Sequence, residues 1–125
     1  MFHSRNFIGQ CRRALRGQPK LIPDQLQQIE ELTVRHVPGV PRDLARDLFA
    51  ALTDTPVQSA EEIETLIQTL ADMVDLFAQQ YDDNADPFGT REWEILRDLV
   101  DSYAQELDVE VIQYVMERVV SHKAL

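Results

Sequence analysis

Cysteine is almost absent from this sequence of 125 residues, and glycine is scarce. The single cysteine, Cys11, excludes a disulfide within the chain and any zinc site that needs several cysteine ligands. The four glycines are dispersed, which excludes a glycine-rich loop of the kind that cradles phosphate groups. The sequence therefore predicts neither a cysteine-based zinc site nor a glycine-rich phosphate-binding loop.

Long apolar runs are missing as well. The longest covers residues 48–52, whereas a membrane-spanning helix needs about 20 predominantly apolar residues. No apolar stretch of roughly 7–15 residues follows the first basic residue, so we expect no secretory signal. The lack of disulfides fits a reducing compartment. We therefore expect a cytoplasmic protein, and import into an organelle stays open because the first residues are rich in arginine and free of acid.

Basic residues are outnumbered, with 12 lysines and arginines against 22 acidic residues and a net charge of −10. Residues 1–20 carry five basic residues and no acidic one, whereas residues 54–110 carry 16 acidic residues against Arg91 and Arg97. An acidic surface repels nucleic-acid backbones and anionic lipids. Contact with either class of partner is therefore expected only through residues 1–20.

Apolar residues recur at spacings of three and four along most of the chain, which predicts helices. Pro23 is typical of a helix start, and Ser59 with Glu62 forms the pattern of a capping box. The expected helices span residues 4–16, 23–36, 41–53, 59–81, 90–107 and 108–120. Short connections predict an all-α, single-domain antiparallel helical bundle of five to six helices. We expect the last three helices to form its spine, with the shorter first three across one end.

Two parts of this bundle differ in charge: a basic amphipathic helix in residues 1–20 and an acidic helical bundle in residues 21–125. The apolar side of the first helix lies opposite Arg12, Arg13 and Arg16. Such a helix can lie on an anionic membrane, contact nucleic acid or serve as a targeting sequence. It can also be a core helix whose arginines pair with the acidic body, and the charge of that body favours this interpretation.

A thiol nucleophile with a base would have to combine Cys11 with His3, His36 or His122. Cys11 lies in an apolar stripe, which favours an inert core thiol, although the basic residues that follow it would lower its pKa if it were exposed. The acidic residues fall opposite the apolar stripes, where solvated surface is expected rather than an acid–base pair. The sequence therefore predicts no catalytic residue and a protein that is not an enzyme, with a cryptic small enzyme as an alternative.

The loop at residues 82–89 contains part of a pattern for a metal ion. Asp82, Asn84 and Asp86 occupy the first, third and fifth positions of a calcium-binding EF-hand loop. Pro87 stands where that loop needs glycine, and Trp93 stands where it needs a bidentate glutamate. We therefore predict no metal and no cofactor, and weak binding of a divalent cation at the three loop residues stays open.

Phe88 and Trp93 follow the same acidic loop. Aromatic and arginine side chains dominate protein interfaces, so the predicted partner-binding residues are Arg12, Arg13, Arg16, Phe88 and Trp93. The sequence leaves open whether Phe88 is an exposed anchor or a core residue, and it favours burial of Trp93.

By elimination, the expected function is that of a non-enzymatic protein–protein interaction module, such as a regulator, adaptor, chaperone or inhibitor. Its acidic helical surface would attract a protein with a basic surface. The alternative is a nucleic-acid or anionic-membrane binder that acts through residues 1–20. A homodimer and a monomer both stay open, because residues 59–81 form a helix long enough to pair with its own copy.

Overall fold

The computed structural model describes residues 4–15, 23–53, 59–79 and 88–123, and these residues are largely helical. The helices are α1 (Ser4–Leu15), α2 (Pro23–His36), α3 (Arg42–Leu52), α4 (Ala60–Phe77), α5 (Thr90–Ser102) and α6 (Val109–Lys123), with a short 3-10 helix, η1 (Ala104–Glu106), before α6. No strand occurs in these ranges, and the predicted all-α class is confirmed. None of the described helices is long and apolar enough to cross a membrane.

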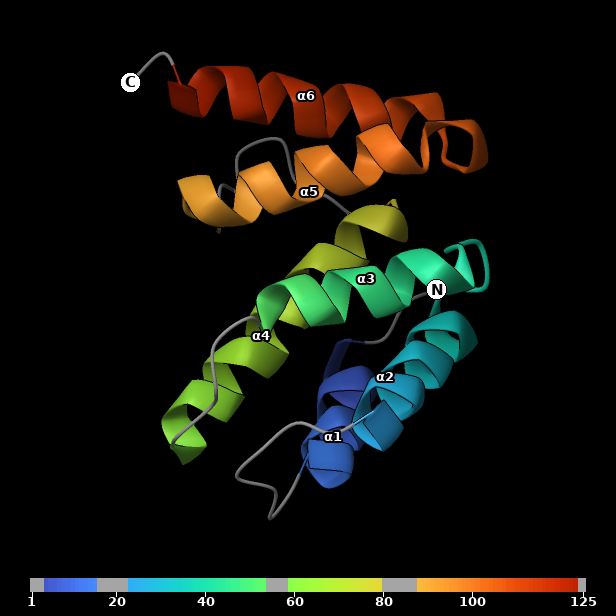
Figure 1. The fold of residues 1–125 in the computed structure, drawn as a ribbon, viewed down its shortest axis with the longest axis vertical. Coiled ribbons are helices and arrows are strands. Elements are labelled where there is room, and N and C mark those ends of the chain that lie inside the picture. Colours follow the sequence, from blue (N-terminus) through green and yellow to red (C-terminus); the bar gives the residue numbers. More distant parts are fainter. Residues whose placement is uncertain (1–3, 16–22, 54–58, 80–87, 124–125) are drawn as a thin grey trace.

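The helices stack along the long axis of the molecule (Figure 1). α5 and α6 form an antiparallel hairpin at one end, and α1 and α2 lie at the other end. α3 packs closely against α2 and also contacts α4 and α5, so it connects the two ends. The core of the bundle therefore runs continuously from α1 to α6.

The predicted spine of the last three helices is not formed. α4 packs chiefly against α1 and α3, whereas α6 packs chiefly against α5. The buried face of α4 is wide, and it includes Leu66, Ile67, Leu70, Ala71, Met73, Val74, Leu76 and Phe77. A face of this width needs helices on both sides to cover it, and helical periodicity does not say which helices these are.

Helix starts follow the local sequence signals more closely than helix ends do. α2 begins at Pro23, and the Ser59 hydroxyl accepts the backbone N–H of Glu62 at 3.1 Å at the start of α4. α4 ends at Phe77, four residues before its predicted end, of which the last two lie outside the described residues. The predicted helix over residues 90–107 is divided at Tyr103, whose hydroxyl donates to Asp47 of α3 at 2.7 Å.

The N-terminal helix belongs to the core. Phe7, Cys11 and Leu15 of α1 are completely buried. This burial confirms the core interpretation of the N-terminal helix over its described residues. The apolar face of α1 is therefore not available to a membrane in this structure, because it already packs against α2 and α4.

Candidate functional site

A buried acidic residue, Glu30, lies between α2 and α3. Its side chain is 1% exposed, so the prediction that the acidic residues lie on outer helix faces is wrong for this one. The buried residues of α2 are those at positions 25, 29, 30 and 33, whereas the spacing of apolar residues in the sequence predicts an inner stripe of Leu26, Ile29 and Leu32. The face is rotated because α2 packs against both α1 and α3, which cover it from two sides.

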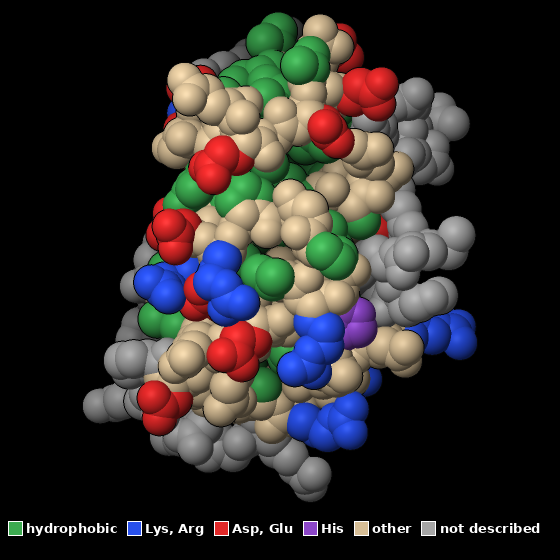
Figure 2. All heavy atoms as spheres, turned by 90° about the vertical axis from the view of Figure 1, so that its right-hand side faces the viewer, with side chains coloured by type: hydrophobic (Ala, Val, Ile, Leu, Met, Phe, Trp, Pro, Cys, Tyr) green, Lys and Arg blue, Asp and Glu red, His purple; other side chains and the backbone are tan. Residues whose placement is uncertain are grey.

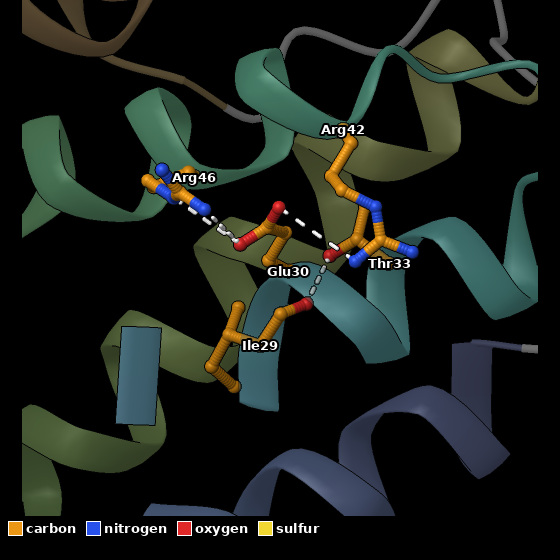
Figure 3. Close-up of polar contacts among 5 residues, drawn as sticks. All are labelled: Ile29, Glu30, Thr33, Arg42 and Arg46. Atoms are coloured by element: carbon orange, nitrogen blue, oxygen red, sulfur yellow. Dashed lines mark hydrogen bonds and ion pairs between the residues drawn. The ribbon is translucent and has the colours of Figure 1, made fainter. Parts of the chain in front are cut away.

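Two arginines of α3 approach the Glu30 carboxylate (Figure 3). Arg46 donates to Oε2 from Nε at 3.1 Å and from Nη2 at 2.9 Å, and Arg42 Nη1 lies 3.7 Å from Oε1. The hydrogen bond to Glu30 is the main reason that the pKa of Arg46 is raised. One turn after Ile29, the Thr33 hydroxyl donates to the Ile29 carbonyl at 2.8 Å, which satisfies a polar group inside the same buried face.

The Glu30 cluster joins helices rather than performing chemistry. One buried negative charge faces two guanidinium groups that are about half exposed. A general acid or base must reach a substrate, whereas this carboxylate is enclosed between α2 and α3. The cluster therefore fixes how α3 sits on α2, and it leaves positive charge at the surface beside it.

The predicted arginines of the N-terminal helix have different surroundings. Arg12 pairs with Glu64 of α4: its Nε lies 2.9 Å from both carboxylate oxygens, and its Nη2 lies 2.8 Å from Oε2. Arg13 is exposed and makes no hydrogen bond or ion pair with another described residue. Arg16 lies outside the described residues. Pairing of Arg12 with the acidic body is the arrangement that the core interpretation predicted.

Phe88 and Trp93 are core residues of the α5–α6 hairpin. Their side chains are 6% and 1% exposed, and their rings meet edge to face with centroids 4.9 Å apart. Trp93 also lies beside the rings of Tyr114 and His122 of α6. Burial of Trp93 is confirmed, and Phe88 is not an exposed anchor, because its ring packs against Trp93. Neither ring is presented to a partner in this structure.

Cys11 is an inert thiol. Its side chain is completely buried, and burial raises the pKa of the thiol to about 12. A thiol with this pKa is protonated at neutral pH and is a poor nucleophile. His36 of α2 contacts other residues of α1: its Nε2 lies 2.5 Å from Gln10 Oε1, and its ring meets Phe7 edge to face. The basic residues beside Cys11 do not offset the effect of burial on its pKa.

α6 carries an apolar stripe whose two ends are exposed to solvent. Val109 and Val120 are 65% and 67% exposed, and they are the exposed large apolar residues of the described chain. Ile112 and Met116 lie between them at spacings of three and four, and both are half-buried. By this spacing the four residues, which we call the α6 stripe, share one edge of α6. α6 lies at one end of the molecule (Figure 1).

The stripe was not predicted from the sequence. The spacing of apolar residues predicts an inner stripe of Ile112, Val115, Met116, Val119 and Val120. Val115 and Val119 are buried and Ile112 and Met116 are partly buried against the core, whereas Val120 is exposed, and the structure buries Val111 and Tyr114 in addition. Apolar residues cover more of the circumference of α6 than one contact face needs, so packing against α5 leaves some of them outside. The signal in the sequence was the second helical series at positions 109, 112, 116 and 120.

The loop residues with a calcium pattern, Asp82, Asn84 and Asp86, lie outside the described residues. Within the described ranges, no three histidine, cysteine or acidic side chains come together in a group that could hold a metal ion. The chain matches no known protein family, no curated protein and no solved structure.

Proposed function

We propose that the chain is a protein-interaction module that binds a basic amphipathic helix of another protein along α6. One observation carries the proposal: the α6 stripe is apolar, its ends Val109 and Val120 are open to solvent, and Ile112 and Met116 between them are half-buried. Single exposed apolar residues are ordinary on a protein surface, but four on one edge of a helix form a continuous line. Val109 and Val120 are 11 positions apart, or about 16 Å along the helix. A partner helix of three turns matches that length.

The position of α6 supports a helical partner. α6 packs chiefly against α5, so its outer edge has no covering helix among the described elements. An amphipathic helix that binds a neighbouring helix places apolar residues at spacings of three and four along one line. The α6 stripe has the same spacing, so side chains from the two helices can interdigitate along it.

The charge around the stripe supports a basic partner. Residues 88–122 contain eight acidic residues against Arg91, Arg97 and Arg118. Arg97 pairs with Asp98, and Arg118 lies over the Tyr114 ring, so the acidic excess is left at the surface. Glu110 and Glu117 are exposed on α6 itself. A negative field of this kind steers basic proteins and speeds their association.

The same charge argues against a second copy as the occupant of the stripe. A homodimer through α6 would place Glu110 and Glu117 of one chain near the same residues of its copy. Like charges brought together across an interface oppose binding. The same two glutamates attract a basic partner and repel a second copy of the chain.

The proposed module acts without a reaction of its own, as a regulator, adaptor, chaperone or inhibitor. We place it in the cytoplasm, because its one cysteine is a buried thiol and the chain cannot form an internal disulfide. The proposal concerns α6 and its neighbours, and it makes no use of the N-terminal arginines.

The test uses a synthetic peptide that forms a lysine-rich amphipathic helix with one apolar stripe. The isotope-labelled full-length protein is titrated with this peptide at low salt, and changes in backbone amide NMR signals locate the contact. We expect saturable changes concentrated on α6, and we expect binding to weaken by about tenfold or more in the double variant Val109→Ser, Val120→Ser. Both side chains are exposed, so the fold should be retained, which circular dichroism checks.

Three controls separate the stripe from general electrostatic attraction. Ser121→Ala changes an exposed polar residue of the same helix that falls outside the spacing of the stripe, and it should leave binding unchanged. A peptide of the same composition but scrambled order has the charge without the stripe and should bind more weakly. An acidic version of the helix should not bind. Equal binding of the ordered and scrambled peptides, or a dimer in sedimentation that Val120→Ser dissociates, would overturn the proposal.

A further inference from the structure

A groove of about 340 Å³ runs between α1 and α2, at the end of the molecule that lies away from α6 (Figure 1). α1 contributes Gln10, Arg13 and Ala14 to its lining, and α2 contributes Gln28, Glu31, Leu32 and Arg35. Ala14 and Leu32 are half-buried, whereas the two arginines are exposed. The groove therefore combines an apolar strip with guanidinium groups from both helices.

The two arginines of the groove differ from most described arginines because they have no partner among the residues that the structure describes. Other described arginines pair with carboxylates, donate to a backbone carbonyl or lie over an aromatic ring; these are Arg12, Arg42, Arg46, Arg91, Arg97 and Arg118. Arg13 and Arg35 make no hydrogen bond or ion pair with the residues that the structure describes. The exposed Arg5 also makes no hydrogen bond or ion pair with a described residue, but it does not line the groove.

The surroundings of Arg13 and Arg35 favour an anionic ligand as the partner of their guanidinium groups. The chain has 22 acidic residues, yet Glu31 is the one acidic residue in the lining of the groove. On the face drawn in Figure 2, the lysine and arginine side chains gather in the lower half of the molecule, the half that contains α1 and α2 in Figure 1. On this face, guanidinium groups are therefore concentrated at one end of an otherwise acidic protein.

We infer that the α1–α2 groove binds a small organic phosphate. A guanidinium group matches the geometry of a phosphoryl group and can donate two hydrogen bonds to it. Arg13 and Arg35 approach from different helices, so one phosphoryl group can receive donors from both sides. Ala14 and Leu32 then receive the carbon part of the ligand. The volume lies at the lower end of the range for small-molecule sites, about 300–1,000 Å³.

The amide side chains of the groove suit the same ligand. Gln10 meets His36 Nε2 through its Oε1 atom, which leaves the Gln10 amide N–H groups as donors. Gln28 adds a second amide at the edge of the groove. Glu31 opposes an anion by its charge, so it limits affinity and makes the site sensitive to substitution at this position.

The experiment titrates the isotope-labelled full-length protein at low salt with inorganic phosphate, pyrophosphate and phenyl phosphate, and follows backbone amide signals by NMR. We expect saturable changes at α1 and α2 residues of the groove. Phenyl phosphate should bind more tightly than inorganic phosphate, because its ring covers Ala14 and Leu32. Sulfate at the same ionic strength serves as the comparison for a general anion effect.

Four exposed positions provide matched variants. Arg13→Gln and Arg35→Gln should each weaken phenyl phosphate binding by about tenfold, the effect of losing one charge-assisted contact. Arg5→Gln removes the same charge from the same helix outside the groove and should leave binding unchanged. Glu31→Gln should tighten binding. Circular dichroism confirms that each variant is folded, so a loss of binding is not a loss of structure.

The outcomes are distinct. If Arg5→Gln weakens binding as much as Arg13→Gln, the effect belongs to overall charge and the proposal is wrong. Equal binding of sulfate and phenyl phosphate also overturns it. If duplex DNA or RNA binds tightly while the small phosphates do not, the basic end is a nucleic-acid surface and the small-ligand site is refuted. These results do not depend on α6, so the proposal stands or fails separately from the proposed function.

Discussion

Replacement of Glu30 by glutamine tests how the buried carboxylate holds α2 to α3. The substitution keeps the shape of the side chain and removes its charge. Oε2 of Glu30 accepts two hydrogen bonds from Arg46, at 2.9 and 3.1 Å. Hydrogen bonds to charged groups contribute about 1.5–3 kcal/mol and neutral ones about 0.5–1.5 kcal/mol. Because both bonds end on one oxygen and are not additive, we expect Glu30→Gln to lower the free energy of unfolding by about 2 kcal/mol.

A larger loss is not expected from the geometry. Removing one partner of a fully buried ion pair costs about 3–5 kcal/mol, because the other charge stays buried and unpaired. Here the arginines that face Glu30 are about half exposed, so water can solvate them when the carboxylate is gone. Loss of the carboxylate therefore leaves Arg42 and Arg46 solvated, and most of the cost of a buried unpaired charge is avoided.

Urea unfolding followed by far-ultraviolet circular dichroism measures the change, with Glu31→Gln as the control. Glu31 is the next residue on α2, is exposed and makes no ion pair with another described residue, so its substitution should change stability by less than about 0.5 kcal/mol. In thermal unfolding, Glu30→Gln should lower Tm by roughly 5–10 °C.

Glu30→Met sharpens the test, because methionine fills the same space without a buried polar atom. Replacing a buried charge by an apolar side chain removes its desolvation cost, so Glu30→Met should destabilise less than Glu30→Gln. If Glu30→Gln and Glu31→Gln have the same stability, the buried ion cluster contributes nothing and the reasoning is refuted. If Glu30→Met is the more damaging change, the cost is one of packing rather than charge.

Three further predictions follow from other contacts. Cys11 should react with a thiol reagent after unfolding and not in the native protein, because burial raises its pKa to about 12; fast labelling of the native chain would contradict this. Ser59→Ala should lower the free energy of unfolding by about 1 kcal/mol through loss of the cap on α4, whereas Ser121→Ala, on exposed α6 surface, should have no effect in the same urea assay. The hydrogen bond to Asp47 raises the pKa of Tyr103 to about 12, so the contact stabilises the fold below pH 10 and the stabilisation disappears as pH rises toward 12. Asp47→Asn should move the phenol titration, followed by absorbance, down toward 10.0, and an unmoved titration would exclude the contact.

The two proposed sites lie in parts of the chain with opposite charge. Residues 1–53 carry eight basic and five acidic residues, whereas residues 54–125 carry four basic and 17 acidic residues. The fold places α1 and α2 at one end and α6 at the other (Figure 1). A phosphate ligand and a basic protein can therefore bind at separate ends, and each site can be disabled without changing the other.

Several features of the fold were predictable because their causes are local. The period of apolar residues predicts each helix, since side chains three and four residues apart share a face of a helix and can be buried together. Pro23 and Ser59 mark helix starts because a proline ring and a capping hydroxyl act within one turn of the backbone. The burial of Cys11 followed in the same way from its place in an apolar stripe.

Other features depended on which helices meet. Glu30 is buried because α1 and α3 cover α2 from two sides, and its partners Arg42 and Arg46 belong to another helix. Phe88 is buried by contact with Trp93, and the fold turns Val120 outward because α5 covers only one side of α6. No local pattern distinguishes these outcomes, since each apolar series on a helix can face either a neighbour or solvent.

The sequence by itself determined the helical class, most helix starts, the inert cysteine and the contrast between a basic beginning and an acidic remainder. These properties depend on composition and on interactions within a few residues. The tertiary structure decided the pairing of helices, the buried ion cluster, the α6 stripe with its exposed ends, and the groove where Arg13 and Arg35 have no partner among the described residues. Those features arise from contacts between segments distant in the chain, where burial and charge pairing are set by the neighbours that each face acquires.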